Sequence, residues 1–368
     1  MHVFFRADSS SVIGTGHIVR CLTLAKKLRD HGAITTFICR NLVGNCSQLI
    51  QSPNSKHMLE NTDDLNETTN KCFEREEIYS AKIQNLDAEE CISIIKRKEL
   101  SDIVWIVVDH YAIDSLWESH FYSRGYNVLV IDDLANRQHK CSILLDQNLY
   151  PNYQNRYLSK LDNKPKQLLG TNYALLRDDF SEYRPSAIPK MYKKNNPLKA
   201  LIYFGGVDAN NITLKVIESL KGSEFKHVEF GILVGIANPN KEVIAEYIKH
   251  DSKLKLIEHT ADICKLMKSY SCIVGASGTT TWERFCLGIP SAVISIAKNQ
   301  TPIAEHLDRL GAIYYIGYYK ELTHQTIADK IKLFLQDVNL REKCAQTGFE
   351  LVDGKGTERV ANQITSQF

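Results

Sequence analysis

Short apolar runs alternate with amphipathic segments along the first half of the chain, beginning at residue 2. Continuous apolar runs of this length are typical of strands that a parallel sheet buries on both faces. Strands are predicted at residues 2–7, 35–40, 103–110, 127–133 and 141–148. A stripe with helical spacing follows the first run, at Ile18, Cys21, Leu22, Ala25 and Leu28. This alternation of strand and helix predicts an α/β fold.

A stretch rich in proline and basic residues, at positions 181–197, interrupts the pattern and predicts a linker. A second series of strands is predicted after it, at residues 198–206, 227–235, 254–258, 270–278 and 290–296. We therefore expect two α/β domains, at residues 1–180 and 198–355, and a C-terminal helix at residues 356–368. Ligands of such sheets bind outside the carboxyl ends of the strands, so we expect the site in a cleft between the two domains.

The composition argues against several classes of partner and location. A net charge of +2 over 368 residues gives no general attraction to nucleic acid or to anionic membranes. An arginine and an aspartate lie within the first eight residues, and no run approaches the ~20 apolar residues of a membrane span. We therefore expect a cytoplasmic protein, and we expect it to be a monomer. The ten cysteines form no C-x-x-C pair and no zinc-type spacing, so we interpret them as reduced, mostly buried thiols.

The turn after the first strand contains Gly14 and Gly16, directly before the predicted helix. Glycines allow a positive φ or a close ligand, and a helix start presents free N–H groups. Half of a dinucleotide fingerprint is present, but Val19 stands where the third glycine belongs. Arg40 follows the second strand where an acid would bind the ribose of NAD, which leaves an NADP-dependent oxidoreductase as an alternative.

His17 begins the helix after this turn. The helix dipole disfavours a positive charge at an amino terminus, so a histidine there tends to stay neutral and can accept a proton. A neutral imidazole is a suitable general base. The other interpretation is that His17 only caps the turn or packs against a neighbouring surface.

Two further turns follow strands of the second series. Gly205 and Gly206 end one strand, where their amides could bind phosphate oxygens or simply form a tight turn. The other turn offers hydroxyls and amides that suit a diphosphate, at Ser277, Gly278, Thr279 and Thr280. Glu283 lies one helical turn later and has two interpretations. It either closes a capping box with Thr280 or accepts hydrogen bonds from two ribose hydroxyls.

These motifs resemble those of the UDP-sugar hydrolases of pseudaminic acid biosynthesis, which remove UDP from UDP-2,4-diacetamido-2,4,6-trideoxy-β-L-altropyranose. The resemblance runs from about residue 3 to residue 315. It rests, in chain order, on FRADSSSVIGTGHIVRC, DHY at residues 109–111, LLDQN, YALLRDDF, FGG, GASGTTTWERFCLGIPS and KNQ at residues 298–300. The family is similar to GT-B glycosyltransferases, which implies two Rossmann-like domains, UDP bound mainly by the second, and a last helix that packs back on the first.

The resemblance also implies roles for individual residues. His17 becomes the base that activates water for attack on the anomeric carbon, with inversion and loss of UDP. Glu283 becomes the ribose ligand, and residues 277–280 bind the diphosphate. Residues implied to contact the substrate elsewhere are Asp8, Gly14, Gly16, Tyr111, Gly205, Gly206, Asn299 and Gln300. The family needs no metal or other cofactor, in agreement with the absence of a D-x-D motif here.

One segment departs from the resemblance: residues 44–77 are polar and match no motif of the family. Two other functions remain possible on the same fold. A glycosyltransferase would use the same UDP site and deprotonate an acceptor hydroxyl instead of water. A non-catalytic protein that binds nucleotide sugars would lack the base, whereas His17 is present.

Overall fold

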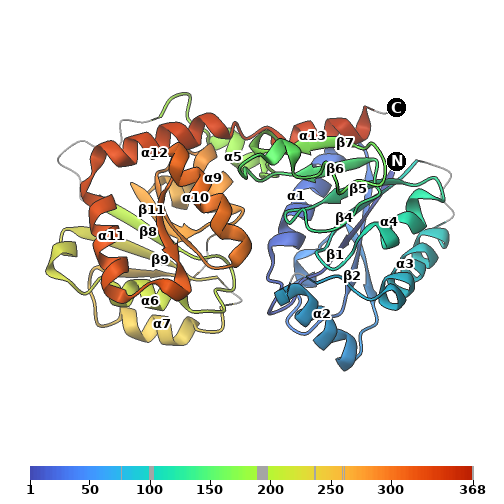
Figure 1. Cartoon of the computed structure of the whole chain (residues 1–368). Helices are drawn as coiled ribbons and strands as arrows, with labels where there is room; N and C mark the ends of the chain where they lie inside the picture. The colour runs from blue at the N-terminus through green and yellow to red at the C-terminus, as the bar shows by residue number, and fades with distance from the viewer. Residues whose placement is uncertain are drawn as a thin grey trace. The chain divides into compact units, whose positions relative to one another are not determined.

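The computed structural model describes residues 1–75, 77–98, 103–188, 198–235, 238–258, 260 and 262–366. The chain forms two compact units (Figure 1). The first contains residues 1–148, 152–175 and 356–368, and the second contains residues 149–151 and 176–355. The boundary therefore precedes the stretch predicted as a linker, because residues 178–183 form a helix of the second unit. Residues 189–197 of that stretch lie outside the described residues.

The first unit is built around a parallel sheet of strand order β3-β2-β1-β4-β5-β6-β7. Its strands are β1 (His2–Ala7), β2 (Ile34–Arg40), β3 (Ser55–Leu59), β4 (Val104–Asp109), β5 (Asn127–Ile131), β6 (Ile143–Asp146) and β7 (Lys166–Leu169). Its helices are α1 (Gly16–Asp30), α2 (Asp63–Arg75), α3 (Ala81–Lys96), α4 (Ser115–Tyr122) and α13 (Gly356–Thr365). Short 3-10 turns lie at η1 (Ser47–Leu49), η2 (Tyr153–Asn155) and η3 (Thr171–Tyr173).

The second unit repeats this design with a parallel sheet of order β10-β9-β8-β11-β12-β13. Its strands are β8 (Leu198–Tyr203), β9 (Val228–Leu233), β10 (Leu254–Ile257), β11 (Cys272–Ala276), β12 (Ser291–Ser295) and β13 (Tyr314–Tyr318). The helices are α5 (Asp178–Tyr183), α6 (Ile212–Ser219), α7 (Lys241–Ile248), α8 (Ile263–Lys268), α9 (Thr280–Cys286), α10 (Thr301–Leu310), α11 (His324–Gln336) and α12 (Val338–Leu351). Its 3-10 turns are η4 (Ser223–Phe225), η5 (Lys298–Gln300) and η6 (Tyr319–Glu321).

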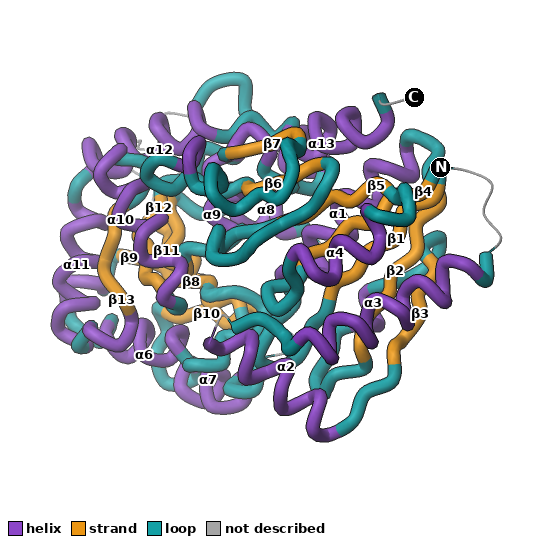
Figure 2. The backbone as a smooth tube through the Cα atoms, turned by 45° about the vertical axis from the view of Figure 1, so that its right-hand side comes forward, coloured by secondary structure: helices purple, strands orange, loops and turns teal. Residues whose placement is uncertain are grey.

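Helices cover both faces of the first sheet, which explains its continuous apolar strands. One core packs α1 and α13 on one face, and the other packs α3 and α4 on the opposite face. Every residue of β1 and β4 is therefore buried. Figure 2 shows the helices outside the strands in each unit. All ten cysteines are buried and none forms a disulfide, and no helix in the described ranges is long and apolar enough to cross a membrane.

The sequence pattern missed β3, β7 and β13, which are edge strands. β3 alternates half-buried and exposed positions before a buried Leu59, and two of the four residues of β7 are exposed. A strand at an edge needs no continuous apolar run, because one side of it has no neighbouring strand to cover it. The pattern therefore recovers the central strands of both sheets and the edge strand β10, and it misses the other three edge strands.

The last helix, α13, packs on α1 in the first unit, as Figure 1 shows. Val360, Ala361 and Ile364 are fully buried in the same core as α1. At the start of α13, Glu358 pairs with Lys27 at 3.5 Å and with His31 at 3.2 Å. The end of the chain thus completes the core that positions the helix bearing His17.

We predict that Ile364→Ala destabilises the first unit by about 2–5 kcal/mol, because it leaves a cavity in a closed core. Calorimetry should show the unfolding temperature of that unit falling by roughly 5–15 °C. Leu158→Ala is the control, because Leu158 in the same unit is 77% exposed and should change stability by less than about 0.5 kcal/mol. Equal effects of the two variants would contradict the packing of α13.

Candidate active site

His17 lies in the first turn of α1, where the chain leaves β1. Gly14 makes the tight turn with a φ of +77°, and a Cβ at Gly14 or Gly16 would meet no atom within 4 Å. The backbone at both glycines therefore has open space beside it, and the predicted contact with a ligand there stays a prediction. His17 is 6% exposed, and its Nδ1 lies 2.5 Å from Oδ1 of Asp109.

Asp109 is the last residue of β4, and the parallel register of β1 and β4 sets it beside Ala7. The Asp109 carboxylate is fully buried and accepts two hydrogen bonds from Arg20, each 2.6 Å long. Burial alone raises the pKa of Asp109, but Arg20 and His17 outweigh burial and lower it well below its usual range. An ionised Asp109 can only accept, so Nδ1 of His17 carries the proton.

This arrangement makes Nε2 of His17 the acceptor. Within the described ranges, no side chain or backbone group is hydrogen-bonded to Nε2. Nδ1–H donates to a fixed carboxylate, so the lone pair of Nε2 is available to take a proton. The structure therefore adds a cause that the sequence did not reveal: a buried carboxylate sets the tautomer, in addition to the position at the helix start.

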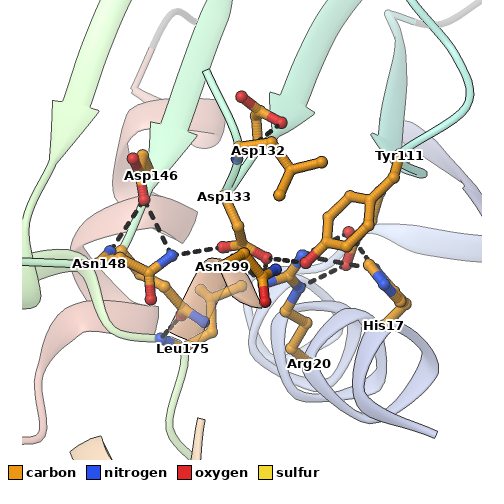
Figure 3. A network of polar contacts seen from close by, with 12 residues as sticks. His17, Arg20, Tyr111, Asp132, Asp133, Asp146, Asn148, Leu175 and Asn299 are labelled. Carbon is orange, nitrogen blue, oxygen red and sulfur yellow. Dashed lines mark hydrogen bonds and ion pairs between the residues drawn. The ribbon is translucent and has the colours of Figure 1, made fainter. Parts of the chain in front are cut away.

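Arg20 connects His17 and Asp109 to a wider polar network (Figure 3). Its Nη1 donates to both oxygens of Asp133, at 3.1 and 2.8 Å. Asp133 also accepts from the Tyr111 hydroxyl at 2.7 Å and from Nδ2 of Asn148 at 2.6 Å. His17 and Arg20 are three residues apart on one helix, so both point to the same face.

Tyr111, predicted to contact substrate, packs its ring edge-on against His17 at 4.7 Å between centroids. Phe73 of α2 stacks on Tyr111 at 4.8 Å and lies 5.4 Å from the His17 ring. Phe73 belongs to the polar segment that matched no motif. That segment therefore has a defined place beside the candidate base.

The prediction that Asp8 contacts substrate is not supported by its surroundings. Asp8 is 1% exposed and pairs with Arg6, at 2.6 and 2.9 Å. It also accepts the backbone N–H of Arg40 at 2.7 Å, and His110 lies 3.2 Å away. Both oxygens are occupied by the protein itself, so Asp8 fastens the end of β1 to the end of β2.

In the second unit, the predicted binding turns follow β8, β11 and β12, which are adjacent in the sheet. Gly205 has a φ of +97°, and a Cβ at this position would meet no atom within 4 Å. Gly235 approaches the backbone of Gly206, where a Cβ would lie 2.1 Å from the Gly206 carbonyl oxygen. Asp208 caps the following helix by accepting from Ile212 and Thr213, both at 2.9 Å. The turn therefore has open space on the Cβ side of Gly205.

The turn after β11 holds polar groups that the protein leaves unpaired. Ser277 is 5% exposed, and its hydroxyl has no partner within the described part of the chain. Gly278 has open space around it, and Thr279 is the N-cap residue of α9 without a side-chain cap bond. Thr280 begins α9. A buried hydroxyl without a partner is costly, which favours a ligand at this turn.

The capping-box interpretation of Glu283 is not what the structure shows. Thr279 rather than Thr280 is the N-cap, and no side chain caps this helix. Within the described ranges, the Glu283 carboxylate makes no hydrogen bond. Burial raises the pKa of Glu283 to about 7, against the opposing effects of Arg177 and Arg284. An acid held this way gains from a ligand that donates hydrogen bonds.

Asn299 and Gln300 lie in η5, after β12. The side-chain oxygen of Asn299 is buried and has no partner within the described ranges. The side-chain oxygen of Gln300 is already hydrogen-bonded, because Oε1 accepts the backbone N–H of Ile296 at 3.1 Å. Of the two residues, Asn299 has the side-chain acceptor that is free for a ligand.

The sequence motifs do not single out four residues of the network around His17: Arg20, Asp109 as a partner of the base, Asp133 and Asn148. A signal was present, because the strands of the first unit end in acids or amides at Asp109, Asp132, Asp133, Asp146 and Asn148. Adjacent parallel strands bring such ends to one edge of the sheet. The sequence therefore indicates the edge of the sheet at which these side chains gather, but it does not indicate which of them form hydrogen-bonded pairs.

The chain is similar in sequence to curated proteins. No family model matches the chain. It is 27% identical over 319 residues, 86% of its length and 99% of the relative's, to UDP-2,4-diacetamido-2,4,6-trideoxy-β-L-altropyranose hydrolase of Campylobacter jejuni. It is 23% identical over 363 residues, 98% of its length and 96% of the relative's, to the spore coat polysaccharide biosynthesis protein SpsG of Bacillus subtilis.

Solved structures give the fold. MurG of Acinetobacter baumannii matches 99% of this chain and 99% of its own, with a TM-score of 0.66 and 15% identity. The spinosyn rhamnosyltransferase SpnG matches 100% of both chains, with a TM-score of 0.64 and 13% identity. The predicted fold class, two Rossmann-like α/β domains of the GT-B type, is confirmed. The resemblance drawn from the motifs is likewise confirmed: over most of its length this chain is similar to a UDP-sugar hydrolase.

Proposed function

We propose that this protein is a hydrolase that releases UDP from UDP-2,4-diacetamido-2,4,6-trideoxy-β-L-altropyranose or a closely related nucleotide sugar. The observation that carries the proposal is the His17 side chain, whose Nδ1 is held by Asp109 while Nε2 is left to accept a proton. A relative that is 27% identical bears this activity in its name. The pathway that the resemblance implies is the synthesis of pseudaminic acid.

In the proposed reaction, Nε2 of His17 takes a proton from water as the water oxygen bonds to the anomeric carbon. The bond between that carbon and the diphosphate oxygen breaks, and UDP leaves with the electron pair. Attack from the face opposite UDP inverts the configuration. Asp109 stabilises the imidazolium that forms, and Arg20 holds Asp109 ionised.

The second unit is proposed to bind the UDP moiety. The amides and hydroxyls at residues 277–280 suit the diphosphate, with Ser277 as the buried hydroxyl that a phosphate oxygen would satisfy. The Glu283 carboxylate suits the ribose hydroxyls, and the Asn299 oxygen suits a donor on the sugar or uracil. Gly205 offers a further open amide. Such fixed donors stabilise the charge of the leaving diphosphate.

A glycosyltransferase is the second candidate, because the solved structures with this fold include a rhamnosyltransferase. Its base would deprotonate an acceptor hydroxyl instead of water. Steady release of UDP without any acceptor separates the two, because a transferase does not turn over on water at the same rate. The non-catalytic binding protein and the NADP-dependent oxidoreductase are less supported, because neither function accounts for the hydrogen bond by which Asp109 orients His17.

We predict that His17→Asn lowers UDP release in the absence of acceptor by ~10²- to 10⁴-fold, the usual contribution of a general base. UDP affinity should stay unchanged, because the proposed UDP ligands belong to the second unit. A coupled assay for UDP and calorimetric titration measure the two quantities. His250→Asn is the control, since its side chain is 78% exposed. Retention of most of the activity in His17→Asn would assign the base to another residue.

We predict that UDP binds the wild type about tenfold more weakly at pH 6 than at pH 8. Only an ionised Glu283 accepts from two ribose hydroxyls, and a group with a pKa of about 7 is mostly protonated at pH 6. Glu283→Gln should bind UDP roughly tenfold to a hundredfold more weakly at pH 8, with the loss of a charge-assisted hydrogen bond.

The phosphate groups of UDP also titrate in this pH range and change its affinity. Glu283→Gln shows the size of that change, because it lacks a titrating group at position 283. Calorimetric titrations of wild type and Glu283→Gln at both pH values isolate the part that belongs to Glu283. Glu246→Gln, at an exposed position of α7, controls for the change of charge. Equal affinities of wild type and Glu283→Gln at pH 8 would remove Glu283 from the UDP site.

We predict that EDTA leaves the rate unchanged, because amides and hydroxyls rather than a metal are proposed to hold the diphosphate. In support, the described residues contain no group of three His, Cys, Asp or Glu side chains placed to bind a metal ion. The measurement is UDP release before and after chelation. Activity lost to EDTA and restored by Mg²⁺ or Mn²⁺ would contradict this part of the proposal.

A further inference from the structure

Asp133 is the point at which the network around His17 converges. The residue is 8% exposed, and its carboxylate accepts hydrogen bonds from Arg20, Tyr111 and Asn148. A carboxylate in an ion pair with Arg20 only accepts, so each of its partners must turn a hydrogen toward it. Asp133 therefore fixes the orientation of its partners, and only their remaining hydrogen-bond acceptors are free to bind a ligand.

Asn148 shows this effect most clearly. Its Nδ2 donates to Asp133 at 2.6 Å and to Oδ1 of Asp146 at 3.1 Å, so both hydrogens of the amide are used. The backbone N–H of Asn148 also donates to Asp146, at 3.0 Å, which fixes the residue. The side-chain oxygen consequently points away from the two carboxylates (Figure 3). Within the described ranges no group donates to that oxygen.

Tyr111 is fixed in the same sense. Its hydroxyl donates to Asp133 at 2.7 Å, so the oxygen keeps only lone pairs for another partner. Its ring packs edge-on at 4.7 Å between centroids from the ring of His17, so Tyr111 lies beside the candidate base. Tyr111 and Asn148 share one carboxylate, Tyr111 at Oδ2 and Asn148 at Oδ1. Both side chains therefore lie within hydrogen-bond distance of the same carboxylate, and each keeps an oxygen that can accept.

We propose that Tyr111 and Asn148 form an acceptor surface, set by Asp133, that selects a sugar carrying hydrogen-bond donors: amide N–H groups or a hydroxyl next to an amide. The proposal rests on the proposed hydrolase function and names what the site recognises in the sugar. Asn148 and Tyr111 contact the sugar, and Asp133 is a positioning residue that acts through them. A sugar that presents only acceptors there would leave these oxygens unpaired, which sites of this kind reject strongly.

The competing interpretation is that the network only fastens the ends of β4, β5 and β6 together. In that case the side-chain oxygen of Asn148 would face water, and deletion of a donor from the sugar would cost the same with or without Asn148. A double-mutant cycle between protein and substrate separates the two interpretations, because it isolates the direct contact from general damage to the fold.

The test uses the nucleotide sugar UDP-2,4-diacetamido-2,4,6-trideoxy-β-L-altropyranose and three analogues. Two analogues replace one N-acetyl group, at carbon 2 or carbon 4, by an O-acetyl group, which keeps the carbonyl and removes the N–H. The third replaces the hydroxyl at carbon 3 by fluorine. Each analogue therefore lacks one donor. Values of kcat/KM are measured for wild type, Asn148→Ala, Tyr111→Phe and Asp133→Asn.

We expect at least one analogue to lose about tenfold to a hundredfold in kcat/KM with the wild type and less than about threefold with Asn148→Ala or Tyr111→Phe. Asp133→Asn should reduce the same discrimination, because an amide at position 133 no longer forces its neighbours to donate. Asn155→Ala, an exposed asparagine in the same loop region, should behave as the wild type.

Three outcomes decide the proposal. Losses that are the same in wild type and in all three variants, for every analogue, overturn it. An unfolding temperature of the first unit equal to that of the wild type, measured by calorimetry, shows that a variant is folded, and Tyr111→Phe keeps the test valid if Asn148→Ala fails that check. Absence of UDP release from the parent compound with wild type would instead contradict the proposed hydrolase function, before any variant is compared.

Discussion

The ion pair between Arg20 and Asp109 is the interaction on which the arrangement around His17 depends. Asp109 is fully buried, and a buried carboxylate is costly unless a cation and hydrogen bonds compensate it. Arg20 supplies both, with two bonds of 2.6 Å to Asp109 and two more to Asp133. Removing Arg20 would leave two carboxylates unpaired beside His17. The planar guanidinium also fixes their geometry, which a lysine at this position would not do.

The two units differ in how their polar groups are paired. In the first unit, the charged groups beside His17 (Arg20, Asp109 and Asp133) are paired with one another, so the network holds its geometry without a ligand. In the second unit, the hydroxyl of Ser277 and the side-chain oxygen of Asn299 are buried and have no hydrogen-bond partner within the described ranges. Preorganised groups favour catalysis, because their orientation costs nothing during the reaction. Unsatisfied buried groups favour binding, because the ligand removes their cost.

A second buried network explains why the glycine turn before His17 can remain open. Arg6 bridges Asp8 and Asp87, and Asp8 accepts the backbone N–H of Arg40. These bonds tie the ends of β1 and β2 to helix α3, so the turn at residues 9–16 starts from a rigid base. The glycines then need no side-chain packing to keep their conformation. The open space beside Gly14 and Gly16 is the result.

The sequence by itself determined the centres of both sheets and the motif residues. Strands buried on both faces require continuous apolar runs, so β1, β4 and β11 are visible in the sequence, while the half-exposed edge strands β3 and β7 are not. The motifs also identified His17 and the turn at residues 277–280, because a glycine-rich turn before a helix is a local feature.

Only the tertiary structure decided which groups meet. Asp109 lies 92 residues from His17, and the register of β1 with β4 brings them together. Sequence spacing fitted two roles for Glu283, and the observed N-cap at Thr279 removes one of them. Asp8 belongs to a motif, yet its carboxylate accepts hydrogen bonds from Arg6 and from the backbone N–H of Arg40. A one-dimensional pattern records burial and local turns, because they depend on neighbouring residues. Charge pairs and hydrogen-bond polarity depend on residues that are distant in the chain, so only the folded arrangement specifies them.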